Sequence, residues 1–326
     1  MKILITGGAG MLGRKLTERL AADGHIGRHT ITSLTLHDVV AGTKPAGASF
    51  PVDVVVSDLS VVGQAEKLVG ARPDLIFHLA AIVSGEAEQD FDRGYRVNLD
   101  GTRYLLEAIR KVENRPRVVF TSSIAVYGAP FPEAIGDEFF HTPLTSYGTQ
   151  KAIGELLFAD YTRKGFLDGI GIRLPTICVR PGAPNKAASG FFSNIIREPL
   201  AGREAVLPVS EGVRHWFASP RAAVGFLLHA AAIDGAEVGP RRTLTMPGLS
   251  VTVGEQIAAL KKIAGEEVAA RIRREPDSAI MTIVEGWPRN FEAKRAMDLG
   301  FEAESSFEEI VRIHIQDELG GQIPRN

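Results

Sequence analysis

The fold is decided by a stretch near the start of the chain, KILITGGAGMLG at residues 2–13. Apolar and β-branched residues at positions 3–6 run directly into glycines with the spacing G-x-x-G-x-x-G. An amphipathic stretch then continues over residues 11–20. This order is typical of a buried strand, a tight turn and the start of a helix.

Such a turn suits a pyrophosphate. Glycines lack a Cβ, so the backbone can turn sharply and come close to a ligand. The start of a helix adds unpaired N–H groups and the positive end of its dipole. We therefore expect residues 7–13 to hold the phosphates of a dinucleotide. The glycines alone also fit an ordinary strand-to-helix turn.

The composition limits the class of protein. With 326 residues, the chain can form one large core or two lobes. A net charge of -2 gives no reason to expect nucleic acid or an anionic membrane surface as a partner. The lone Cys178 cannot form an internal disulfide, and we expect it to be buried. No apolar run approaches the roughly 20 residues of a membrane span. Because residues 1–2 lead at once into a strand, we expect no signal peptide and a cytoplasmic location.

Strand and helix patterns alternate along the first third of the chain. Strands are expected at residues 31–37, 52–56, 75–79 and 117–120, with helical patterns at 59–69 and 92–112. This alternation predicts an α/β fold with a doubly wound, Rossmann-like parallel sheet. Ligands of such sheets bind beyond the carboxyl ends of the strands, where this chain places Asp38, Asp58 and Ser122-Ser123.

Asp38 is a candidate for the adenosine ribose. A carboxylate at the end of the second strand accepts hydrogen bonds from ribose hydroxyls and repels a 2′-phosphate, which favours NAD over NADP. It follows Gly13 by more than the usual ~20 positions, and the insert at residues 24–30 accounts for the excess. The alternative is a solvated aspartate in a turn.

Tyr147 and Lys151 lie one helical turn apart, on a helix that we expect to end near residues 164–165. Free tyrosine titrates near ~10, and an ammonium close to it favours the phenolate. A general base works best with a pKa close to the working pH. The hydroxyl of Ser123 can hold the reacting oxygen of a substrate.

Five motifs occur in one order: T-G-G-x-G-x-x-G at 6–13, H-L-A-A at 78–81, N-x-x-G at 98–101, Ser123, and Y-x-x-x-K at 147–151. Together they resemble the extended short-chain dehydrogenase/reductase family, which includes sugar-nucleotide epimerases and dehydratases. The resemblance implies an NAD-dependent enzyme in which Tyr147 is the acid/base, Ser123 its hydroxyl partner and Lys151 the residue on the nicotinamide ribose. It implies a structural role for His78 and a bracing role for Asn98. The cofactor-binding residues that we expect are Gly7, Gly10, Met11, Leu12, Gly13, Asp38, Asp58, Leu59, Leu79, Ala80, Ala81, Asn98, Tyr147, Lys151, Pro175 and Thr176.

Two departures from the family bear on the substrate. Dehydratases carry an Asp-Glu pair directly after the Ser/Thr, and here residues 124–125 are Ile-Ala, so dehydration is disfavoured. Where epimerases begin a motif with R-D-F, Arg214 is kept and His215 replaces the aspartate, which weakens the case for a nucleotide-sugar. Residues 175–194 and 214–216 are more similar to family members that oxidise a small sugar acid at its 2-hydroxyl with NAD.

A sugar acid needs a cationic or amide-rich pocket for its carboxylate, and arginine suits it best. For each charged candidate, a solvated surface position is the open alternative. We predict no metal ion. The predicted substrate residues are Ser84, Ser122, Ser123, Tyr147, Arg180, Asn185, Lys186, Ser189 and Arg214.

Two rival functions stay open: a nucleotide-sugar 4-epimerase with tightly bound NAD, and a non-enzymatic sensor of NAD. The resemblance implies interleaved domains, an NAD-binding domain at 1–175 and about 215–248 and a substrate lobe at about 176–214 and 249–326. Further helices are expected at about 190–200, 253–264 and 306–319. It also implies a homodimer through the helices at 92–112 and 147–164. Their apolar residues could serve that contact or the core: Leu105, Ile109, Leu156 and Phe158.

Overall fold

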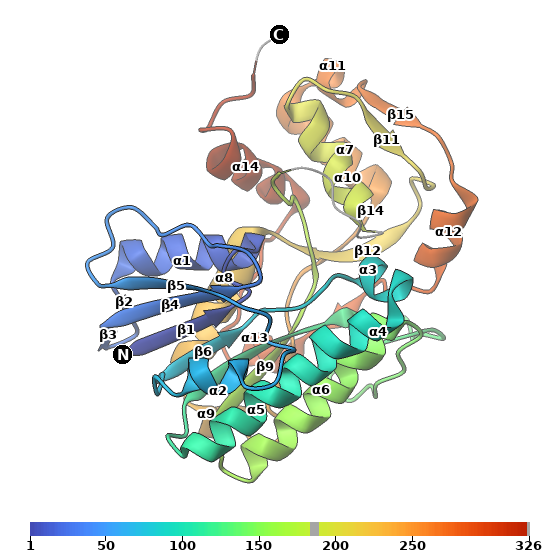
Figure 1. The fold of residues 1–326 in the computed structure, drawn as a ribbon. Helices are drawn as coiled ribbons and strands as arrows, with labels where there is room; N and C mark the ends of the chain where they lie inside the picture. Colours follow the sequence, from blue (N-terminus) through green and yellow to red (C-terminus); the bar gives the residue numbers. More distant parts are fainter. Residues whose placement is uncertain (183–188, 325–326) are drawn as a thin grey trace.

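A parallel sheet of seven strands forms the centre of the computed structural model, which describes residues 1–182 and 189–324 (Figure 1). Neighbouring strands are parallel throughout. The central strands are almost fully buried, as expected for a parallel sheet covered on both faces. The predicted doubly wound, Rossmann-like fold is confirmed. In spatial order the strands are β13 (Thr243–Thr245), β9 (Asp168–Leu174), β7 (Arg117–Ser123), β6 (Leu75–His78), β1 (Lys2–Thr6), β4 (Ser33–Asp38) and β5 (Val52–Val56).

The strand order changes direction between β1 and β6. From β1 the chain adds β4 and β5 on one side, and it then returns to add β6, β7, β9 and β13 on the other. Open α/β sheets bind their ligands in the crevice at this point, beyond the carboxyl ends of the strands. The glycine turn, Asp38, Leu79 and Ser123 all lie at those ends.

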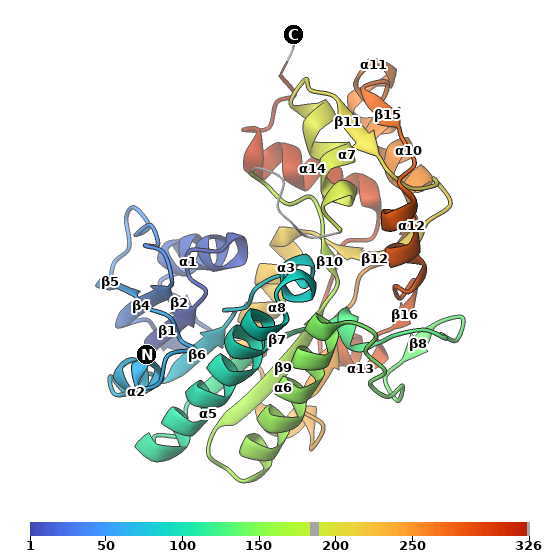
Figure 2. The same cartoon turned by 45° about the vertical axis from the view of Figure 1, so that its right-hand side comes forward.

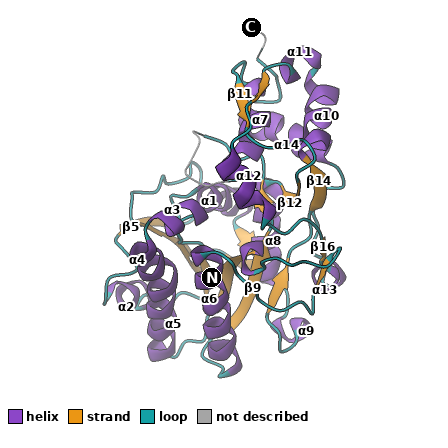
Figure 3. Cartoon of the chain, turned by 90° about the vertical axis from the view of Figure 1, so that its right-hand side faces the viewer, coloured by secondary structure: helices purple, strands orange, loops and turns teal. Residues whose placement is uncertain are grey.

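Helices cover both faces of the sheet and close a hydrophobic core on each. Side chains such as Leu16 and Phe226 fill one core, and Leu105 and Phe158 fill the other. The first face carries α1 (Met11–Asp23) and α8 (Pro220–Ala232); the second carries α2 (Gln64–Val69), α5 (Gly101–Val112) and α6 (Ser146–Arg163). Figures 1 and 3 show α5 and α6 side by side on the second face.

A smaller lobe lies beyond the sheet (Figure 2). It has its own buried core, which includes Phe192, Leu260 and Ile310. Because this core draws on residues 178–209, 217 and 253–315, the lobes alternate along the chain; the domain bounds that we predicted stay a proposal. The elements of this part are β10 (Thr176–Ile177), α7 (Gly190–Leu200), β11 (Ala205–Leu207), β12 (Arg214–Ala218), β14 (Leu249–Thr252), α10 (Val253–Ala264), α11 (Glu266–Ala269), β15 (Ile272–Arg274), α12 (Ser278–Glu285) and α14 (Phe307–Glu318).

Short elements complete the chain. The insert before β4 is a small hairpin, and one two-residue strand near residue 135 pairs with another near residue 291. These elements are β2 (His25–Ile26), β3 (His29–Thr30), α3 (Ser84–Gln89), α4 (Phe91–Gly94), the π-helix η1 (Tyr95–Asp100), the 3-10 helix η2 (Ile124–Val126), β8 (Ile135–Gly136), α9 (Gly235–Val238), α13 (Lys294–Asp298) and β16 (Phe291–Glu292).

Several predicted elements differ from those observed. The strand expected at 31–37 begins at Ser33, and the helix expected at 92–112 is divided into α4, η1 and α5. The helix expected at 59–69 begins only at Gln64, because the Asp58 side chain accepts hydrogen bonds from the Ser60 amide and hydroxyl and forms a turn instead. The strand expected at 117–120 continues to Ser123, so both serines belong to β7. The helices expected at about 190–200 and 253–264 have the predicted bounds.

The apolar residues considered for a dimer contact differ in their exposure to solvent. Leu105, Ile109 and Phe158 are buried in the core, and only Leu156 is exposed, at 65%. A homodimer therefore stays a prediction that rests on Leu156 alone among these four. Within the described part of the chain, no helix is both long and apolar enough to cross a membrane.

Candidate active site

Two positions of the glycine turn pack so closely against other backbone that a side chain would collide with it. A Cβ at Gly7, whose φ is +80°, would lie 2.7 Å from the backbone nitrogen of Ala80, and one at Gly13 would lie 2.3 Å from the Gly7 carbonyl oxygen. Gly10 is exposed at the start of α1, and no side chain caps this helix or places an acid in its first turn. The half-buried Met11 and Leu12 open the helix. The glycines therefore allow the tight turn, and the uncapped amides at the start of α1 fit the pyrophosphate of NAD.

Asp38 lies beside this turn, at the end of β4. Its carboxylate accepts hydrogen bonds from the amides of Ala9 at 3.0 Å and Val39 at 2.7 Å. The Ser57 amide donates to the Asp38 carbonyl at 3.0 Å, which holds Asp58 at the same edge of the sheet. Leu59, the next residue, is buried in the core. Asp38 and the half-buried Asp58 are thus placed where an adenosine would leave the phosphates.

We expect Asp38→Asn to weaken the preference for NAD over NADP by about 5- to 1000-fold. A carboxylate close to a 2′-phosphate repels it by about 1–4 kcal/mol, depending on exposure to solvent, and the amide removes that repulsion. Dissociation constants of both dinucleotides for both proteins measure the effect. Asp53→Asn, the same change on the exposed face of β5, is the control. An unchanged NAD/NADP ratio in Asp38→Asn would refute the assignment.

The loop after β6 is held against the helix that carries the predicted acid/base. The Leu79 amide donates to Thr6, and the half-buried Ala80 and Ala81 follow. Asn98 is buried; its Oδ1 accepts from the Ile82 amide at 2.9 Å, and its Nδ2 donates to Gln150 of α6 at 2.8 Å. Asn98 therefore braces this loop. A direct contact between Asn98 and NAD stays a prediction.

His78 has the structural position that we expected. Its ring nitrogens contact the hydroxyls of Thr6 at 2.8 Å and Thr102 at 2.9 Å. Burial, together with the positive charge of Lys151, lowers the pKa of His78 to about 3. The ring is therefore neutral near pH 7.

The predicted triad converges at the end of β7. Thr145 caps α6 by accepting a hydrogen bond from the Gly148 amide, which places Tyr147 in the first turn. The ammonium of Lys151 donates to the Thr121 carbonyl at 2.9 Å and lies 5.8 Å from the centre of the Tyr147 ring. Ser123 is half-buried, and its hydroxyl is close enough to Tyr147 to affect the pKa of the phenol.

The charge balance of the triad differs from the one predicted. Burial raises the pKa of Tyr147 to about 12, against a hydrogen bond to Ser123 and the positive charge of Arg180. Burial lowers the pKa of Lys151 to about 8, which the charge of Glu155 opposes. Our expectation that Lys151 lowers the Tyr147 pKa was wrong for the protein as it stands, because burial dominates.

Pro175 and Thr176 lie where the main sheet passes into the smaller lobe. Leu174 pairs with Ser123 in the β7–β9 register, so Thr176 is two residues beyond the strand neighbour of Ser123. Pro175 is buried and Thr176 half-buried. The Thr176 hydroxyl contacts Nε2 of His215 at 2.7 Å.

The predicted substrate residues divide into three groups. Arg180 lies near Tyr147 and donates to the Ser189 hydroxyl at 2.8 Å. Arg214 donates to the Ser250 carbonyl at 2.6 Å and pairs with Glu255 at 3.3 Å. The third group, Asn185 and Lys186, lies outside the described residues.

The two remaining serines have different surroundings. Ser84 begins α3 and is half-buried. Ser122 is buried, and its hydroxyl donates to Glu155 at 2.5 Å. That bond favours a structural role for Ser122 over the substrate contact that we predicted.

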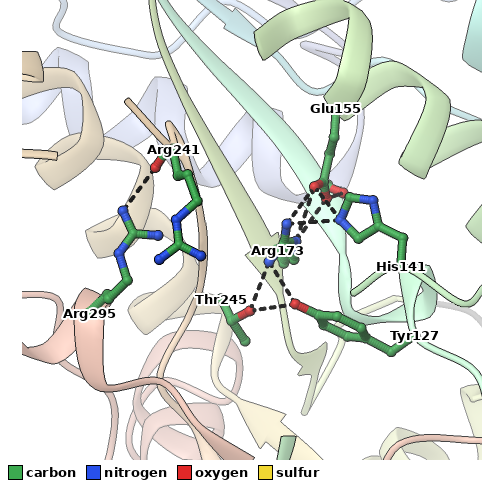
Figure 4. A network of polar contacts seen from close by, with 8 residues as sticks. Tyr127, His141, Glu155, Arg173, Arg241, Thr245 and Arg295 are labelled. Atoms are coloured by element: carbon green, nitrogen blue, oxygen red, sulfur yellow. Dashed lines mark hydrogen bonds and ion pairs between the residues drawn. The ribbon is translucent and has the colours of Figure 1, made fainter. Parts of the chain in front are cut away.

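A buried polar network next to the triad escaped the sequence analysis (Figure 4). At its centre Arg173 makes two hydrogen bonds to Oε2 of Glu155, at 2.7 Å from Nη2 and 3.1 Å from Nε. Arg173 also contacts Tyr127 at 2.6 Å and His141 at 2.9 Å. Burial raises the pKa of Glu155, but the hydrogen bonds from His141 and Arg173 and the charge of Arg173 outweigh it and hold the pKa below its usual range.

The sequence carried one signal for this network. Glu155 follows Lys151 by four residues, so it lies on the same face of α6 as Tyr147 and Lys151. An acid on a buried helix face requires a partner. The identity of that partner, Arg173 on β9, was not readable from spacing.

Comparisons with known proteins agree with this fold. The sequence model of the NAD dependent epimerase/dehydratase family matches residues 3–237. A protein from Cupriavidus necator named D-erythronate dehydrogenase is 48% identical, over 97% of this chain and 98% of its own length. One of the same name from Haemophilus influenzae is 43% identical, over 98% and 100%.

Solved structures extend the comparison. A crystal structure from Agrobacterium tumefaciens, described as a nucleoside-diphosphate-sugar epimerase, is 67% identical with a TM-score of 0.97, covering 99% of this chain and 96% of that one. An L-threonine dehydrogenase from Cupriavidus necator shares the fold at 23% identity, with a TM-score of 0.84 and coverage of 97% and 99%. The chain therefore belongs to the NAD dependent epimerase/dehydratase family, and it is an NAD-dependent oxidoreductase.

Proposed function

We propose that the protein oxidises D-erythronate at its 2-hydroxyl to the 2-oxo acid, 2-dehydro-D-erythronate. The observation that carries the proposal is the near full-length similarity to two proteins named D-erythronate dehydrogenase, at 48% and 43% identity. Arg180, whose guanidinium donates to Ser189 and whose charge reaches the phenol of Tyr147, supplies a cation for the substrate. In a 2-hydroxy acid the carboxylate is attached to the carbon that reacts. A cation next to the proton acceptor is therefore where such a substrate needs it. The names of the two relatives from Cupriavidus necator and Haemophilus influenzae support this substrate class.

The residues of the chain have separate roles in this reaction. Ser123 orients the 2-hydroxyl by a hydrogen bond, and Tyr147 as phenolate takes its proton. NAD, when bound, supplies the acceptor for the hydride from C2. Lys151 is aimed by its hydrogen bond to Thr121, and it would hold the ribose on the nicotinamide side. Arg180 holds the carboxylate, so the C2–H bond is fixed in one direction.

The alternative, a nucleotide-sugar 4-epimerase, has two features against it. His215 replaces the aspartate of the epimerase motif. Arg214, the residue of that motif that is kept, is engaged with Ser250 and Glu255. The description of the Agrobacterium tumefaciens structure is the observation in its favour.

A panel of aldonates with four to six carbons, each with NAD, tests the proposal. We expect reduced nicotinamide to accumulate fastest with D-erythronate. A UDP-sugar in the same panel tests the alternative, because an epimerase interconverts sugars with no net NAD reduction. Sugar epimerisation without oxidation of any aldonate would reject the proposal.

Arg180→Met should raise KM for D-erythronate by about 10- to 100-fold, the value of one charge-assisted hydrogen bond. Steady-state kinetics with saturating NAD measure it. Arg214→Met is the matched comparison, and it should change KM little because Arg214 is bonded to Ser250 and Glu255. The reverse pattern, with the effect at Arg214, would move the carboxylate site to β12.

A further inference from the structure

A chain of two hydrogen bonds connects the candidate site to the smaller lobe. Oγ1 of Thr176 lies 2.7 Å from Nε2 of His215, and Nδ1 of His215 lies 2.8 Å from the carbonyl oxygen of Pro288. His215 is 3% exposed, whereas Thr176 is half-buried at the edge of the site. No other role in the reaction uses His215.

The direction of both hydrogen bonds follows from chemistry. A carbonyl oxygen only accepts, so Nδ1 must carry a hydrogen and donate to Pro288. Burial lowers the pKa of His215 to about 4, although the bond to Pro288 opposes this, so the ring is neutral near pH 7. In that tautomer Nε2 has no hydrogen and accepts. The Thr176 hydroxyl therefore donates its hydrogen to Nε2 of His215, and its oxygen can only accept from a further partner.

Packing fixes the ring in this orientation. His215 stacks on Phe192 with centroids 5.3 Å apart and planes at 3°, and it meets the edge of Phe217 at 5.4 Å. Trp287 covers it from a third side, at 5.3 Å. A flipped ring would turn carbon atoms toward both Thr176 and Pro288 and lose both bonds, so the arrangement is the one that satisfies the buried nitrogens.

We propose that this relay makes Thr176 a specificity-determining residue, whose oxygen accepts a hydrogen bond from a ligand donor and disfavours a carboxylate or phosphate oxygen. Thr176 lies two residues beyond Leu174, the strand neighbour of Ser123, so the donor belongs to a group close to the reacting carbon. The inference deepens the proposed function and rests on it in naming the donor. A four-carbon sugar acid offers its 3- and 4-hydroxyls, and NAD offers the amide of its nicotinamide.

Thr176→Val, which keeps the shape and removes the oxygen, separates these two donors. The substrates are D-erythronate and 2-hydroxybutyrate, which has four carbons and lacks the 3- and 4-hydroxyls. If a substrate hydroxyl is the donor, kcat/KM for D-erythronate falls about 10- to 100-fold, the value for 2-hydroxybutyrate stays unchanged, and so does the NAD dissociation constant. If the nicotinamide amide is the donor, the NAD dissociation constant rises about 10-fold and the substrate ratio stays unchanged.

Thr176→Ser, which keeps the hydroxyl, should restore whichever property Thr176→Val loses. The proposal is overturned if Thr176→Val changes neither the substrate ratio nor the NAD dissociation constant. It is also overturned if the valine variant gains affinity for NAD or D-erythronate, because the Thr176 oxygen would then weaken ligand binding.

A second measurement does not depend on the substrate. Nitrogen-15 NMR of histidine-labelled protein reports which ring nitrogen carries hydrogen, and the His215 signal is assigned by its loss in His215→Gln. We expect the neutral tautomer with hydrogen on Nδ1 near pH 7. The opposite tautomer, or a cationic ring, would reject the relay. If instead no aldonate is oxidised by the unmodified enzyme, the proposed function fails while this tautomer result stands.

Discussion

Tyr147→Phe should lose about 10²- to 10⁴-fold in kcat, the range for removal of a positioned acid or base, while its NAD dissociation constant stays unchanged. The phenol is the titratable group of α6 that lies next to Ser123 and within the field of Arg180. Phenylalanine keeps the ring and removes only the oxygen that takes the proton. Steady-state formation of reduced nicotinamide and calorimetric titration with NAD measure the two quantities.

Tyr161→Phe is the matched control, because Tyr161 lies on the same helix and its hydroxyl bonds to Glu107, away from the triad. It should keep the kcat of the unmodified enzyme. Full activity in Tyr147→Phe, or an equal loss in both variants, would remove Tyr147 from the chemistry.

The pH dependence follows from the same groups. Burial raises the pKa of Tyr147 to about 12, so the phenolate that takes the proton is the minor form near pH 7 and its share grows with pH. The ammonium of Lys151, whose pKa burial lowers to about 8, is lost as the pH rises through about 8. We therefore expect kcat/KM to rise about tenfold per pH unit below about pH 8 and to level off or fall above it. A value of kcat/KM that stays constant between about pH 6 and 8 would contradict this assignment.

The second large effect concerns stability. Glu155→Gln should lower the free energy of unfolding by about 3–5 kcal/mol, because it leaves the buried guanidinium of Arg173 without its countercharge. The Glu155 side chain is 2% exposed and that of Arg173 is 11% exposed. Chemical denaturation, with the slope of the transition checked for constancy, measures the change.

The effect should depend on pH in one direction. The folded pKa of Glu155 lies below its usual value, so its contribution is fully present above the unfolded pKa near ~4.3 and is lost as the pH falls through the folded value. Glu138→Gln, the same change in an exposed pair with Arg241, is the control and should leave stability nearly unchanged. The double variant Glu155→Gln, Arg173→Met should cost less than the sum of its parts, since no lone charge remains. Equal losses at Glu155 and Glu138 would show that burial of the pair has no energetic role.

Local patterns predicted the parts of the site that are local in sequence. The turn at residues 7–13 and the pair Tyr147 and Lys151 are set by neighbouring residues, so spacing was sufficient. The turn at Asp58 was missed because a side chain there competes with the helix for backbone amides.

Contacts between distant segments could not be predicted in this way. Glu155 and Arg173 are 18 residues apart, and Thr176 and His215 are 39 apart. In the sequence, each of these residues is as compatible with an exposed surface position as with a buried position beside a partner. The predicted direction of the Tyr147 pKa shift was wrong for a related reason. The spacing to Lys151 is local in sequence, whereas the burial of the phenol depends on how the whole site packs.

The central claim is that a hydride leaves C2 of a sugar acid while Tyr147 takes the proton of the 2-hydroxyl. D-erythronate carrying deuterium at C2, incubated with NAD and the enzyme, tests it most directly. We expect the deuterium to be recovered in the reduced nicotinamide, and Tyr147→Phe to slow this transfer about 10²- to 10⁴-fold. Reduced cofactor without deuterium, or unlabelled D-erythronate left unchanged while a nucleotide-sugar is epimerised, would contradict it.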